Sequence, residues 1–122
     1  MKKIFIIIIS IFININILHA DDRNLQLNRL FNELKVKDQS SILKIEQKIW
    51  KIWSTHPNND ELTSMLSVGS DFVNNNQYSK AVEIFTKVIE LDPSWAEAWN
   101  KRATVLYMMG EFEKSQKDID EV

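Results

Sequence analysis

The sequence predicts an all-α fold built of antiparallel helix pairs, and three observations support this prediction. The 122 residues include only two glycines and two prolines, which favours long helices over a sheet with many turns. After residue 21, apolar residues recur at the i, i+3, i+4 and i+7 spacing of a helix that buries one face. Residues 62–122 also contain an internal repeat whose two copies are offset by 34 residues.

Residues 1–20 predict a signal peptide. Lys2 and Lys3 precede the apolar run Ile4–Leu18, and the small residue Ala20 is followed by two aspartates. The apolar run has 15 residues, fewer than the roughly 20 that a membrane-spanning helix needs. We therefore expect cleavage after Ala20 and a periplasmic or secreted protein. The alternative is an uncleaved segment that anchors the protein in the membrane.

The charge balance of the expected mature chain restricts the class of partner. After residue 20 the chain carries 13 basic and 17 acidic side chains, a net charge of −4. Binding to nucleic acid needs a cationic surface, so nucleic acid is not an expected partner, and neither is an anionic membrane surface. There is no cysteine, which rules out disulfides and thiolate metal sites. The fold must therefore depend on helix packing.

Residues 21–59 are expected to form a helical hairpin that serves as a degenerate or capping unit. We expect its first helix over residues 22–35. The second helix should begin at a cap provided by Ser40 or Ser41 and end before residues 55–60, whose Pro, Asn and Asp disfavour a helix. Each helix carries an apolar stripe, made of Leu27, Leu30, Phe31 and Leu34 in the first and of Ile42, Ile45, Ile49, Ile52 and Trp53 in the second.

Residues 60–95 and 96–122 are expected to be two copies of one helix–turn–helix unit, the second of them truncated. In the first copy the helices should cover residues 60–74 and 79–91. Asn76 stands where a left-handed residue is needed, and Gly110 occupies the same place in the second copy. The paired positions, all expected on inward faces, are Met65 with Trp99, Gly69 with Ala103, Phe72 with Leu106, Tyr78 with Phe112, Ala81 with Ser115 and Val88 with Val122.

These two copies resemble the tetratricopeptide repeat (TPR), a 34-residue unit of two helices. The resemblance covers residues 62–122, and residues 90–99 resemble the junction between two such repeats. The matching positions are Met65, Val68, Gly69, Phe72, Tyr78, Ala81, Phe85, Val88 and Pro93 in the first copy and Trp99, Ala103, Leu106, Gly110, Phe112, Ser115, Ile119 and Val122 in the second. The resemblance implies a right-handed α-solenoid. Together with the predicted signal peptide, it predicts a TPR protein of the exported bacterial type. Because the second copy stops at Val122, inside its second helix, we also expect the chain to be incomplete at its C-terminus.

The small residues, Pro93 and Arg102 of the two copies each have a physical interpretation. Gly69, Ala81 and Ala103 are small because the two helices of a repeat are expected to cross closely there, and Pro93 ends the second helix. Arg102 departs from the family pattern, and we expect it to pair with an acid, for example Glu83 or Asp71 in the first copy.

The four tryptophans are expected to be structural. Trp99 takes a core position and Trp95 a position at the repeat junction, while Trp50 and Trp53 share one helix face and should bury area against the next helix. An exposed platform for a ligand is the alternative.

No catalytic constellation is found. His56 is predicted to be an ordinary loop residue, since no second ligand or base lies near it in the sequence. Asp118, Asp120 and Glu121 are predicted to form a solvated helix face. We therefore expect no enzyme activity, no cofactor, no metal and no small-molecule substrate.

The family resemblance implies a scaffold for protein–protein interaction, with a partner protein or peptide in the concave groove that the first helix of each repeat lines. Leu66 is also expected to face outward there. The predicted partner-binding residues are Ser70, Asn74, Glu97, Asn100, Lys101, Thr104, Tyr107 and Met108. One alternative is a structural segment that self-associates or pairs with further repeats of a longer protein, and another is an accessory segment of an enzyme.

Overall fold

A computed structural model of the chain describes residues 22–35 and 38–122, apart from the side chain of Ser40. This part contains six helices and no strand, so the prediction of an all-α fold is confirmed. The predicted signal peptide lies outside the described residues. The chain divides into two compact units, Met1–Ile52 and Trp53–Val122.

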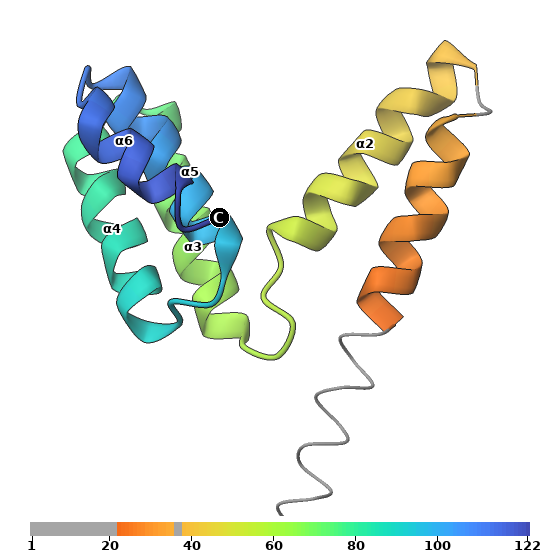
Figure 1. Cartoon of the computed structure of the whole chain (residues 1–122), viewed down its shortest axis with the longest axis horizontal. Coiled ribbons are helices and arrows are strands. Elements are labelled where there is room, and N and C mark those ends of the chain that lie inside the picture. The colour runs from red at the N-terminus through yellow and green to blue at the C-terminus, as the bar shows by residue number, and fades with distance from the viewer. Residues whose placement is uncertain (1–21, 36–37) are drawn as a thin grey trace, which may run out of the picture. The chain divides into compact units, whose positions relative to one another are not determined.

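The first unit is a helical hairpin made of residues 22–34 and α2 (Gln39–Trp53) (Figure 1). Leu30 of the first helix and Ile45 and Ile49 of α2 are buried, as their spacing predicts. The Arg23 guanidinium donates to the carbonyl oxygen of Ile52 at 2.9 Å. This bond joins the beginning of the first helix to the end of α2, so the two helices are antiparallel.

Two predictions about α2 are wrong. Asp38, rather than Ser40 or Ser41, caps the helix, because the helix begins at Gln39 and the Oδ1 atom of Asp38 accepts the N–H of Ser41 at 2.9 Å. Trp50 is half exposed rather than buried, because the isoleucine stripe of α2 turns its own face inward and leaves Trp50 outside it.

The second unit contains α3 (Asp60–Asn74), α4 (Tyr78–Leu91), α5 (Ala96–Met108) and α6 (Phe112–Ile119). Each helix packs against the next, and α3 also contacts α5 (Figure 1). The two copies of the repeat therefore form two helix pairs that nest side by side. The Asn59 side chain caps α3 by accepting the N–H groups of Glu61 and Leu62 at 3.0 and 3.1 Å.

The turns inside the two copies use the same backbone geometry. Asn76 and Gly110 both lie in the left-handed region, with φ of 57° and 78°. Asn and Gly are the residues that tolerate this conformation best. The equivalent N–H donors and carbonyl acceptors are Asn75 to Asp71, Asn76 to Val73 and Gln77 to Phe72 in the first turn, and Met109 to Val105, Gly110 to Tyr107 and Glu111 to Leu106 in the second.

Phe85 is the centre of the core in this unit. It is fully buried, and a Cβ atom added to Gly69 would collide with its ring, at 2.8 Å from Cδ1 and 2.9 Å from Cζ. Ala81 and Ala103 are buried too. The small residues thus mark close helix crossings, as predicted.

The predicted faces are wrong at two kinds of position. Leu66, which was expected to face outward, is only 2% exposed and belongs to the core. Phe112, Ile119 and Val122 are exposed because no helix among the described residues covers that face of α6, while α5 covers the equivalent face of α4. Within the described part of the chain, no helix combines the length and the apolar character needed to cross a membrane.

Candidate functional site

The eight predicted partner-binding residues are carried by α3 and α5. Ser70 and Thr104 each donate a hydroxyl proton to the carbonyl four residues earlier, at 3.0 and 2.9 Å, so both hydroxyl oxygens remain available as acceptors. Asn74, Thr104, Tyr107 and Met108 are exposed. Within α5, contacts join Glu97 to Asn100 and to Lys101.

Glu97 differs from the other seven residues because its side chain is only 8% exposed. The expectation that it faces outward is therefore wrong. Its Oε2 atom accepts a long hydrogen bond from the Asn100 amide at 3.5 Å. Its Oε1 atom lies 3.6 Å from the Lys101 ammonium and has no hydrogen-bond donor. From this position Glu97 contacts two half-buried neighbours on the same helix.

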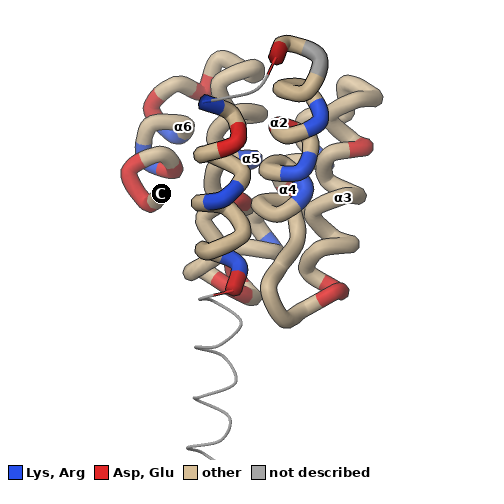
Figure 2. Tube along the Cα trace, turned by 90° about the vertical axis from the view of Figure 1, so that its right-hand side faces the viewer, with Lys and Arg blue, Asp and Glu red and all other residues tan. Residues whose placement is uncertain are grey.

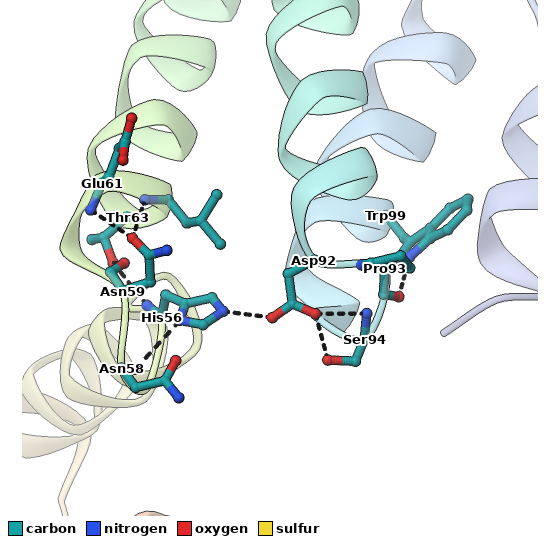
Figure 3. A network of polar contacts seen from close by, with 10 residues as sticks. His56, Asn58, Asn59, Glu61, Thr63, Asp92, Pro93, Ser94 and Trp99 are labelled. Carbon is teal, nitrogen blue, oxygen red and sulfur yellow. Dashed lines mark hydrogen bonds and ion pairs between the residues drawn. The ribbon is translucent and has the colours of Figure 1, made fainter.

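A second polar cluster lies where the loop before α3 meets the junction between the repeats (Figure 3). His56 is buried, and its Nε2 atom lies 2.7 Å from Oδ2 of Asp92. The Asn58 N–H donates to Nδ1 of the same ring at 3.3 Å, so a neutral His56 carries its proton on Nε2 and donates it to Asp92. The ring also meets Trp95 edge-on, with centroids 4.9 Å apart.

Asp92 is held by further bonds. Its Oδ1 atom accepts the N–H and the hydroxyl of Ser94 at 2.9 and 2.6 Å. Partial burial raises the pKa of Asp92, but the hydrogen bonds from Ser94 and His56 and the charge of His56 outweigh this, so the pKa lies below its ordinary value of 3.8. The prediction that His56 is an ordinary loop residue is wrong. Its partner Asp92 is 36 residues away, and no local pattern announces it.

This cluster has the residue types of a hydrolase triad but not the connections. In a triad the imidazole contacts the serine hydroxyl and removes its proton. Here Ser94 donates to Asp92, and Asp92 stands between it and His56 (Figure 3). The arrangement cannot activate Ser94. The hydrogen bond between His56 and Asp92 instead joins the loop before α3 to the repeat junction, and we call this pair the clasp.

Arg102 forms a third cluster, between α4, α5 and α6. Its Nε and Nη2 atoms donate to the two carboxylate oxygens of Asp118, both at 2.7 Å, and Nη1 donates to Thr86 at 3.0 Å. The guanidinium also lies 5.2 Å from the centroid of the Trp99 ring. The expected pairing with Glu83 or Asp71 is therefore wrong, and so is the placement of Asp118 on a solvated face, since its side chain is 6% exposed.

Among the described residues, no group of three or more His, Asp or Glu side chains is placed to hold a metal ion. The clusters around His56 and Arg102 instead join one helix or loop to another.

No family model matches the chain. It is 28% identical over 98 residues to a TPR repeat-containing protein of Rhizobium etli, which covers 80% of this chain and 48% of that protein. It is 35% identical over 49 residues to an uncharacterized protein of Methanocaldococcus jannaschii, covering 40% of this chain and 57% of that one. The chain thus spans about half the length of these curated relatives. With its nested helix pairs, it has an all-α fold of TPR-like helical repeats and is similar to a TPR repeat-containing protein.

Proposed function

We propose that this chain is a non-enzymatic scaffold that binds a polypeptide on the exposed face of α3 and α5. The observation that carries the proposal is the division of α5 into two sides. Ala98, Ala103 and Val105 are buried against the core, while Thr104 and Tyr107 are exposed. In a solenoid of such repeats, the corresponding helix of each unit lines the concave side.

The chemistry of this face suits an extended polypeptide. The Asn100 amide offers both donors and acceptors, and the oxygens of Ser70 and Thr104 can accept backbone N–H groups. Tyr107 and Met108 offer apolar area for side chains of the partner. Lys101 is the one basic residue among the eight, and Glu97 holds it in place.

We also propose that the protein acts outside the cytoplasm, in the periplasm or secreted, because residues 1–20 have the order of a signal peptide. N-terminal sequencing of the protein purified from its native cell would test this. A mature chain that begins at Asp21 would support export with cleavage. A chain that still begins at Met1 would refute cleavage, and fractionation of the cells would then separate a membrane-anchored protein from a cytoplasmic one.

Crosslinking in the native cell, followed by isolation of the crosslinked protein, would provide a partner for quantitative binding. The double substitution Asn100→Ala and Tyr107→Ala should weaken that binding by about tenfold or more, since both residues lie on the proposed face. The matched control is Glu83→Ala with Lys87→Ala, an exposed pair on α4. Unchanged affinity in the first variant, with helicity preserved in both, would rule out this face.

Self-association is the second candidate function. Phe112, Ile119 and Val122 form an exposed apolar stripe on and after α6, and such patches drive association. Sedimentation over a range of concentrations would show a dimer or larger species that Ile119→Ser converts to a monomer. A monomer at all concentrations would exclude this candidate.

A further inference from the structure

The two turns of the repeat provide an internal comparison. Their backbones make the same three hydrogen bonds, but their side chains differ in character. The first copy places Asn74 and Asn75 where the second copy places Met108 and Met109. Two asparagines therefore suffice to form this turn, and folding does not explain the two methionines.

The first turn also uses its polar side chains locally. The Asn75 amide donates to the carbonyl of Asp71 at 2.7 Å, and the Tyr78 hydroxyl donates to Oδ1 of Asn76 at 3.0 Å. Methionine cannot make the first of these bonds, and Phe112, which replaces Tyr78, cannot make the second. The second turn thus lacks hydrogen bonds that the first turn has, and apolar groups stand in their place.

Four side chains make this end of the second copy an exposed apolar surface, which we call the methionine–aromatic patch. Tyr107 is 64% exposed, Met108 50%, Met109 41% and Phe112 59%. The rings of Tyr107 and Phe112 meet edge-to-face with their centroids 5.1 Å apart. Aromatic rings and methionines are enriched at interaction sites, because they bury much area and methionine adapts to different side chains.

The electrostatic surroundings of the patch favour a basic occupant. Residues 53–122 hold twelve Asp and Glu against six Lys and Arg, a net charge of −6. After the patch, residues 113–121 hold four acidic and two basic side chains, and both kinds are seen along α6 (Figure 2). Glu111 is paired with Lys114 at 3.0 Å, but Glu113 has no ion-pair partner among the described residues. The faces of Tyr107 and Phe112 attract cations as well.

We propose that the methionine–aromatic patch anchors a basic segment of the partner polypeptide, one that carries large apolar side chains beside Lys or Arg. This inference rests on the proposed function and assigns a chemical class to the partner. The apolar side chains bind on Met108, Met109 and Phe112, and the flanking cations lie near Glu113. The patch extends the predicted binding face from the end of α5 onto the turn and α6.

The full-length protein would be titrated into two labelled synthetic peptides. One alternates leucine and lysine around a single tryptophan, and the other has glutamate in place of each lysine. We expect the lysine peptide to bind and its affinity to fall with added salt. The variant Met108→Asn with Met109→Asn copies the first turn, so it should fold, and it should weaken binding by about tenfold or more. Glu113→Lys should weaken binding too.

The matched control is Leu91→Asn, which removes an exposed leucine at the end of α4 and should leave binding unchanged. Equal binding of both peptides, or unchanged affinity in the methionine variant, would overturn the assignment of this patch. If the methionine variant still binds the lysine peptide while Asn100→Ala with Ser70→Ala does not, the methionine–aromatic patch is not the anchor, and the proposed function stands. If neither peptide binds, the assignment of a basic segment as the occupant of the patch is wrong. The proposed function is then tested separately, by measuring how tightly the native partner binds the Asn100→Ala and Tyr107→Ala variant.

Discussion

Arg102 on α5 and Asp118 on α6 face each other through two parallel hydrogen bonds of 2.7 Å. The only other buried residue of α6 is Ser115, whose hydroxyl donates to the carbonyl of Ala103 at 2.8 Å. The eight residues of α6 are therefore held to α5 largely by polar contacts. In the first copy, buried apolar residues such as Phe85 and Val88 hold the equivalent helix.

Removal of one partner of this ion pair should destabilise the protein strongly. Arg102→Leu leaves the buried Asp118 carboxylate without its guanidinium, and such losses cost about 3–5 kcal/mol. Urea unfolding followed by circular dichroism would measure the loss. Arg102→Met combined with Asp118→Leu should recover part of it, because no buried charge remains. A loss below about 1 kcal/mol in the single variant would show that the pair is not a main support of α6.

Gly69→Ala tests the close helix crossing. Alanine favours a helix by about 1 kcal/mol over glycine. Here, however, the added methyl group would meet the Phe85 ring, at 2.8 Å from Cδ1, and overpacking of this kind costs about 1–3 kcal/mol. We expect a lower thermal midpoint for Gly69→Ala. Gly69→Ala with Phe85→Leu, which removes the obstructing ring, should lose less than the sum of the two single variants.

The left-handed backbone at Gly110 predicts that valine and asparagine at this position cost different amounts of stability. Gly110 has φ of 78° and open space around it, so only backbone strain opposes a side chain. Gly110→Val should cost about 1–2 kcal/mol, whereas Gly110→Asn should cost less, since Asn76 adopts this conformation in the first copy. Thermal unfolding of both variants would show the order, and an equal loss in the two would contradict the role of backbone strain.

The clasp between His56 and Asp92 predicts a stability that depends on pH. The folded pKa of Asp92 lies below its unfolded value, so its contribution is fully present above the unfolded value and is lost as the pH falls through the folded one. Asp92→Asn should therefore destabilise the protein by about 1 kcal/mol at neutral pH, and the difference from the natural chain should shrink below about pH 4.

A control variant separates the effect of the clasp from the loss of stability that acid causes through other carboxylates. Glu83→Gln removes an exposed carboxylate on α4 and should change the unfolding free energy by less than about 0.5 kcal/mol at any pH. If the difference for Asp92→Asn instead grows on acidification, the direction assigned to its pKa is wrong.

The sequence was sufficient for those features that local rules control. The spacing of apolar residues identified the helices, the left-handed turn needed Asn or Gly at residues 76 and 110, and the repeat placed Gly69 at a crossing. Each of these follows from backbone geometry or from contacts between neighbouring helices. The 34-residue offset then added long-range information, because it gave two copies of the same pattern.

Long-range polar contacts could not be predicted in the same way. Arg102 could have reached several acids, and only the position of α6 selects Asp118. His56 lies in a loop whose path is set by the junction of the repeats. Leu66 occupies a position expected to be exposed, yet it packs into the core. The predicted binding residues remain a prediction, although the exposure of Tyr107 and Met108 is compatible with their proposed role.

The edge contact between His56 and Trp95 gives the protein a built-in optical reporter. A buried indole emits at shorter wavelength than an exposed one, and a nearby protonated imidazole quenches its fluorescence. Loosening of the clasp would change both properties of Trp95 without any added label. Replacing the other three tryptophans with phenylalanine would leave a single emitter, through which events at the repeat junction could be followed in real time as a partner binds.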